Sequence, residues 1–142
     1  MNYWLLIIFG VAGLLAIGAV FVLIYFKPKK IGLKQQDFAK YWQKIDKLIG
    51  SNNLAESKQA VMEADKLLDM VLKSRVNGEN LGSRLKVARS IFRDKKNYNL
   101  AWEAHKLRNK IAHEVDFDPG RDLCYRTVGD FKKVFRDLGY VI

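Results

Sequence analysis

The two histidines of this 142-residue chain, His105 and His113, lie in one stretch together with Arg108 and Asn109. At about 100° per helical residue, Asn109 and His113 share a face, and His105 lies on nearly the same stripe four residues earlier. An imidazole can accept or donate a proton at the 2′-hydroxyl or the 5′-oxygen of RNA near neutral pH. A guanidinium can hold two phosphate oxygens and stabilise the extra negative charge of a transition state. These residue types therefore suit metal-independent RNA cleavage.

Other kinds of site are excluded by composition. The single cysteine, Cys124, rules out an intrachain disulfide, and with only two histidines beside it a Cys/His zinc finger is excluded as well. The closest glycines, Gly10, Gly13 and Gly18, lie in an apolar run and lack the strand-to-helix context of a nucleotide-binding loop. We expect neither a cofactor nor a metal, and we interpret Cys124 as a small packing residue.

Positive charge is concentrated around the histidine stretch. The formal net charge is +10, and residues 83–110 hold nine basic and two acidic side chains. A phosphate-bearing partner such as RNA would explain this block, whereas the alternative is a solvated surface that keeps the domain soluble. Lys86 belongs to the block, and the side chains that we predict to contact RNA are Arg84, Arg89, Arg93, Lys95, Lys96, Lys106 and Lys110.

Apolar periodicity after residue 33 is helical, with no credible alternating strand. We predict long helices over about 34–49, from the N-cap candidates at 51–53 to Asn77-Gly78, from Asn97 or Asn99 to about Glu114, and from Asp118-Pro119 to Gly139. A short helix is predicted over about 83–92. The short loops favour an all-α, antiparallel up-and-down bundle of four long helices plus one short helix.

The pattern Arg108-Asn109-x-x-x-His113 resembles the signature of HEPN domains: an arginine, a polar neighbour, and a histidine four to six residues further on. By helix order and motif together, the resemblance covers about residues 34–138. It implies a HEPN-like bundle and, for active members of that family, a metal-independent endoribonuclease site made by two protomers. It would then make Arg108 the phosphate contact, Asn109 its polar neighbour and His113 the proton-transfer residue, in a homodimer. His105 has no counterpart in that motif.

The sequence leaves two functions open. One is an interaction or RNA-binding module with an unidentified protein partner, and the other is an endoribonuclease with Arg108, Asn109 and His113 as catalytic residues. Structural roles compete with the catalytic ones. Arg108 would then form an ion pair with Glu103, Glu114 or an acid on another helix, and the other two side chains would fasten the helix end to the next loop.

The N-terminal segment is expected to be an uncleaved transmembrane helix, residues 1–26. It carries no charged side chain, and a 24-residue helix would be about 36 Å long, enough for a ~30 Å hydrocarbon core. Lysines cluster in the basic linker 27–33 and at Lys34, and the positive-inside rule then places the domain 34–142 in the cytoplasm. The sequence thus predicts a single-pass protein of the cell inner membrane, with its N-terminus outside and the membrane as an integral partner.

Overall fold

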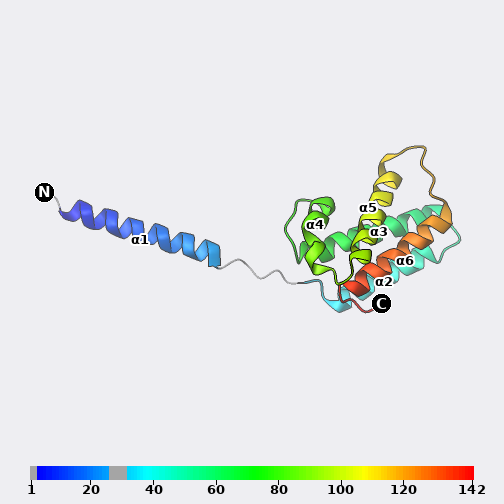
Figure 1. Cartoon of the computed structure of the whole chain (residues 1–142), viewed down its shortest axis with the longest axis horizontal. Helices are drawn as coiled ribbons and strands as arrows, with labels where there is room; N and C mark the ends of the chain where they lie inside the picture. The colour runs from blue at the N-terminus through cyan, green and yellow to red at the C-terminus, as the bar shows by residue number, and fades with distance from the viewer. Residues whose placement is uncertain (1–2, 26–31) are drawn as a thin grey trace. The chain divides into compact units, whose positions relative to one another are not determined.

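The structure is a computed structural model that describes residues 3–25 and 32–142. The chain divides into two compact units, Met1–Lys30 and Ile31–Ile142. Most of the predicted basic linker, including Lys27, Lys29 and Lys30, lies outside the described residues. Within the described ranges the regular secondary structure is entirely helical, as the apolar periodicity predicts (Figure 1).

The prediction of a membrane span is wrong. Helix α1 runs over Tyr3–Tyr25, but within residues 3–25 and 32–142 no helix combines the length and apolar character that crossing a membrane requires. The single-pass topology, the integral membrane partner and the inner-membrane location with the N-terminus outside depended on that span, so they are corrected with it.

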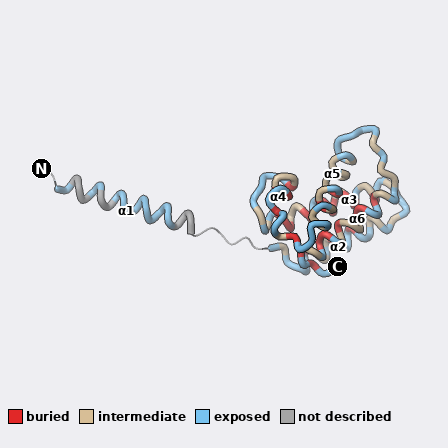
Figure 2. Tube along the Cα trace, viewed as in Figure 1, coloured by how far each residue is buried: buried red, intermediate tan, exposed pale blue. Residues whose placement is uncertain are grey.

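The second unit contains five α-helices and one turn of 3-10 helix within its described residues (Figure 1). The helices are α2 (Gln35–Ile49), α3 (Leu54–Lys73), α4 (Leu81–Val87), the 3-10 helix η1 (Ala88–Ile91), α5 (Lys95–His113) and α6 (Gly120–Asp137). Helix α3 is the central element and packs against α2, α4, α5 and α6. Because it has neighbours on several sides, half of the residues of α3 are buried, and the tube of the helical unit shows the buried residues in red (Figure 2).

Aromatic side chains fill the core between α2, α6 and the C-terminal segment. Phe38 is fully buried, stacks on Tyr140 at a ring-centroid distance of 4.3 Å, and meets the edge of Phe135 at 5.1 Å. Phe131 and Cys124 are also fully buried, so the packing role predicted for the cysteine is confirmed. These inward faces account for the helical period of apolar residues.

Two helix starts differ from the sequence prediction. Helix α5 begins at Lys95, about one turn earlier than the predicted caps Asn97 or Asn99, because the Asp94 carboxylate accepts the backbone N–H of Lys96 at 2.8 Å and caps the helix. Helix α6 begins at Gly120 rather than Pro119. There the Asp118 carboxylate accepts the backbone N–H of Gly120, whose φ of +66° suits glycine.

Candidate functional site

The structure separates the three residues of the HEPN-like motif within one chain. All three lie on α5, but His113 is the last residue of the helix and is exposed, with no side-chain hydrogen bond or ion pair to any described residue. Arg108 is turned toward α3, and its side chain is 31 % exposed. Five residues separate the two, which puts them roughly 140° apart around an ideal helix. One protomer therefore does not bring the guanidinium and the His113 imidazole together.

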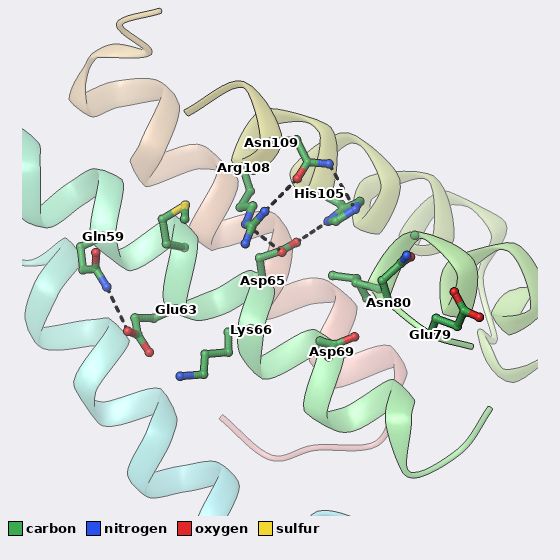
Figure 3. A pocket seen from close by; sticks show the side chains of 13 residues that line it. Gln59, Glu63, Asp65, Lys66, Asp69, Glu79, Asn80, His105, Arg108 and Asn109 are labelled. Atoms are coloured by element: carbon green, nitrogen blue, oxygen red, sulfur yellow. Dashed lines mark hydrogen bonds and ion pairs between the residues drawn. The ribbon is translucent and has the colours of Figure 1, made fainter. Parts of the chain in front are cut away.

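Arg108 and Asn109 instead meet His105 and a buried carboxylate of α3 (Figure 3). Nδ1 of His105 lies 2.8 Å from Oδ1 of Asp65, and Nε of Arg108 forms an ion pair with Oδ2 of the same carboxylate at 3.3 Å. Nη1 of Arg108 donates to Oδ1 of Asn109 at 3.0 Å, and Nδ2 of Asn109 lies 3.3 Å from Nε2 of His105. We call these four residues the Asp65–His105 network.

The network fixes the orientation of the imidazole. Because Arg108 has only donors, the Asn109 oxygen must face it, and the Asn109 amide nitrogen then faces His105. An amide nitrogen donates, so Nε2 of a neutral His105 is the acceptor and Nδ1 carries the proton that is donated to Asp65. In this tautomer the lone pair of His105 is on Nε2 and accepts the N–H of the Asn109 amide.

Asp65 is buried in a position that disfavours the charged form of its carboxyl group. Its side chain is 5 % exposed. Desolvation by burial raises the pKa of Asp65 above its usual range, and the neighbouring Asp69 adds to this rise. The hydrogen bond with His105 and the charge of Arg108 act in the opposite direction. Residues with a perturbed pKa are concentrated at functional sites, so Asp65 is a candidate functional residue.

A cavity of about 710 Å³ opens beside the network. Its walls come from α3, from α5 and from the residues that begin α4. Lys66, Glu79 and Asn80 lie on this wall and are exposed, so the cavity reaches the surface. Gly82 also lines it, and a Cβ atom at that position would lie 3.7 Å from Nε2 of His105. Gly82 therefore lies beside the imidazole, at a distance where a Cβ atom would make an ordinary van der Waals contact.

The predicted RNA contacts are only partly at the surface. Arg84 is 5 % exposed and forms an ion pair with Asp69, so it holds α4 to α3 instead of facing a partner. Lys106 forms an ion pair with Glu103 at 2.8 Å, so its charge is partly neutralised within the chain. Lys110 lies 5.7 Å from the ring centroid of Phe117. The prediction differs from the structure here because counting charges along the chain does not show which acidic side chains lie next to each basic one in the fold.

The remaining predicted RNA contacts, together with Lys86, are exposed and form no ion pair with a described residue. This group consists of Lys86, Arg89, Arg93, Lys95 and Lys96, and we call it the basic segment 86–96. No member forms an ion pair with a described residue; Arg89 lies 5.7 Å over the ring of Tyr98. The segment runs from the end of α4 through η1 to the start of α5. There Asp137, at the end of α6, accepts the backbone N–H groups of Arg93 at 2.9 Å and Asp94 at 3.2 Å.

Nothing in the described ranges suggests a metal centre, because no group of three or more His, Cys, Asp and Glu side chains is arranged to hold an ion there. Asp65 and His105 are the functional candidates that sequence reasoning did not select. His105 had one signal, its spacing of four residues from Asn109 on a helix. Asp65 had none, because it lies forty residues earlier in the chain and meets His105 only through the packing of α3 on α5.

Comparison with known proteins finds no matching family model, no matching curated protein and no matching solved structure.

Proposed function

We propose that residues 34–142 form a HEPN-like interaction domain that binds RNA through the phosphate backbone. The observation that carries this proposal is the basic segment 86–96, in which five cations are exposed and none is neutralised by a described acid. Phosphate contacts of this kind supply most of the affinity of non-specific nucleic-acid binding. The Arg89 guanidinium beside Tyr98 adds a flat surface on which an unpaired base can stack.

The HEPN resemblance supports the same proposal. It rests on the order of the helices and on Arg108, Asn109 and His113, which all lie on α5. The second candidate function is a metal-independent endoribonuclease at the interface of a homodimer. The specific observation in its favour is that His113 is exposed and unpaired at the end of α5, where it can face Arg108 of a second copy.

Salt dependence of RNA affinity tests the binding proposal. Fluorescence anisotropy of a labelled single-stranded RNA measures the dissociation constant of the full-length protein between about 50 and 200 mM salt. If about five cations contact phosphates, log affinity should fall with log salt at a slope of roughly −3.5. Lys95→Glu with Lys96→Glu removes two of the five, so it should weaken binding to every sequence alike and flatten the slope to about −2.

The matched control changes the net charge by the same amount, but on another surface of the domain. Lys40 and Lys47 on α2 are exposed and form no ion pair with a described residue. Lys40→Glu with Lys47→Glu should leave the slope near that of the wild type. Equal losses in both double variants would show a response to net charge alone, and salt-independent binding would refute phosphate recognition.

Complementation tests the second candidate. A site shared by two protomers is repaired when Arg108→Ala and His113→Ala proteins are mixed, because half of the mixed interfaces contain one intact pair. RNA cleavage that is absent from each variant and returns in the mixture would support a dimeric endoribonuclease. Cleavage by the wild type that never returns on mixing would contradict it.

A further inference from the structure

The four side chains of the Asp65–His105 network form a closed ring (Figure 3). Nη1 of Arg108 donates to Oδ1 of Asn109 at 3.0 Å, and Nδ2 of Asn109 donates to Nε2 of His105 at 3.3 Å. Nδ1 of His105 donates to Oδ1 of Asp65 at 2.8 Å. Oδ2 of the same carboxylate forms an ion pair with Nε of Arg108 at 3.3 Å, and this contact completes the ring.

The ring is complete in only one protonation state. Asn109 can donate to His105 only while Nε2 of the imidazole carries no proton. Asp65 must be ionised, because one of its oxygens accepts the N–H of His105 and the other faces the Arg108 guanidinium. The charges of the carboxylate and the guanidinium then cancel, so the ring contains a neutral imidazole and carries no net charge.

A proton on His105 removes the match between donors and acceptors. Both nitrogens of an imidazolium are donors, so Nε2–H would point at the NH₂ group of Asn109. Turning the amide over would present its oxygen to His105, but would also turn the NH₂ group toward Nη1 of Arg108, which is another donor. In this arrangement the Asn109 oxygen can therefore face Arg108 or a protonated His105, but not both.

We propose that Asn109 is the moving part of a pH-sensitive switch: when His105 takes a proton from solvent, the Asn109 amide turns its oxygen from Arg108 to the imidazolium, and Nη1 of Arg108 is released toward the cavity. The trigger falls near neutral pH, because histidine is the side chain whose charge ordinarily changes between about pH 5 and 8. Arg108 keeps its ion pair with Asp65 through Nε, so α5 stays attached to α3 in both states.

The charged groups around the imidazole decide how readily it takes the proton. On α3, Asp65 is in contact with Nδ1 and stabilises an imidazolium, and Asp69 lies close enough to Asp65 to influence its charge. At the start of α4, Glu79 is an exposed acid of the cavity wall without an ion pair to a described residue. The cations Lys66 on α3 and Arg108 on α5 act in the opposite direction.

The switch changes the cavity beside it. His105, Asn109 and Arg108 all line this space, so protonation adds one positive charge to the wall and frees a guanidinium N–H there. The side chain of His105 is 13 % exposed, so the proton can arrive from solvent without unfolding of α5. Since the ring closes within one chain, the proposal does not depend on RNA binding and is tested without RNA.

NMR spectroscopy of the full-length, ¹⁵N-labelled protein tests the switch. Every sample carries His113→Ala, a change at an exposed residue, so that His105 is the only histidine left to titrate. Between about pH 8 and pH 5, we expect the signals of the His105 ring, the Asn109 amide and the Arg108 guanidinium to change with one shared midpoint. Arg108 signals that stay constant while His105 titrates would overturn the proposal. So would an unchanged Asn109 amide, which would show that the first proton enters Asp65 instead.

Two substitutions at Asn109 separate the switch from general packing. Asn109→Asp supplies an oxygen to both neighbours, so the midpoint of the His105 titration should rise by about one pH unit or more, and Arg108 should no longer respond at that midpoint. Asn99→Asp, at an exposed position of the same helix, adds the same charge and should leave the wild-type behaviour nearly unchanged.

Asn109→Ala removes the shared side chain. His105 should still titrate, and the Arg108 signals should no longer follow it, while circular dichroism confirms that the helices are retained. Arg108 signals that still follow His105 in Asn109→Ala would show that the coupling bypasses the amide, and would overturn the assignment of Asn109 as the switch. Equal midpoints in Asn109→Asp and Asn99→Asp would contradict it as well.

Discussion

The hydroxyl of Tyr140 donates a hydrogen bond to the backbone carbonyl of Leu33, 3.1 Å away, and so joins the two ends of the helical unit. Gln35 strengthens this closure: its amide nitrogen donates to the carbonyl of Val141 at 2.8 Å, and its amide oxygen accepts the Val141 N–H at 3.2 Å. The C-terminal residues after α6 are therefore part of the packed structure.

Tyr140→Phe should lower the free energy of unfolding by about 0.5–1.5 kcal/mol, because it removes one partly buried hydrogen bond and keeps the ring on Phe38. Urea denaturation followed by circular dichroism measures the change. Tyr125→Phe is the control, since that ring is 67 % exposed and its hydroxyl has no hydrogen bond to a described residue. Identical midpoints for both variants would show that the closure does not stabilise the fold.

Phe131→Ala should cost about 3–5 kcal/mol of unfolding free energy. The ring is fully buried on α6 and stacks on Phe135 at 6.3 Å, so its removal leaves a cavity in the aromatic core. Val115→Ala, at a residue 99 % exposed in the loop before α6, should change stability by less than about 0.5 kcal/mol. A Phe131→Ala protein as stable as the wild type would contradict the core assignment.

The stability contribution of Asp65 should have an acidic pH dependence. Burial raises the pKa of Asp65 above its ordinary value of 3.8, so the folded state holds this proton more tightly than the unfolded state. The contribution is therefore complete below pH 3.8 and is lost as the pH rises through the folded-state pKa. The unfolding free energy of wild type minus that of Asp65→Asn should fall with increasing pH in this window.

Asp118→Asn is the control, because the stability contribution of Asp118 should change with pH in the opposite direction. The backbone N–H of Gly120 first, and then Lys58, lower the pKa of the exposed Asp118 carboxyl below 3.8. Its contribution is present above pH 3.8 and is lost as the pH falls through the folded-state pKa. The two difference curves should thus slope in opposite directions, and equal slopes would contradict the assigned environment of Asp65.

Cys124 should react with iodoacetamide only when the protein unfolds. The side chain is fully buried, and desolvation raises the pKa of its thiol above the ordinary value of 9.0. Mass spectrometry should find little alkylation of the native protein at pH 8 and complete alkylation in urea, with a midpoint that follows the circular dichroism transition. Rapid alkylation without urea would place Cys124 at the surface.

Helix existence and approximate extent were readable from the sequence, because each helix has an apolar stripe at the helical period. The stripe with Phe38, Trp42 and Ile45 on α2 is buried as its spacing predicts. Asn53 was readable as a cap as well, since it accepts the backbone N–H groups of Ala55 and Glu56. Such local signals act within one turn, so they need no knowledge of the other helices.

The composition of the candidate site was decided by tertiary structure. The sequence presented Arg108, Asn109 and His113 as a set, whereas the packing of α3 on α5 placed Asp65 between Arg108 and His105 and left His113 at the helix end. The same packing buried Arg84 against Asp69. Charge and spacing along one helix determine which side chains share a face, but which of them are paired, buried or free depends on acids supplied by another helix.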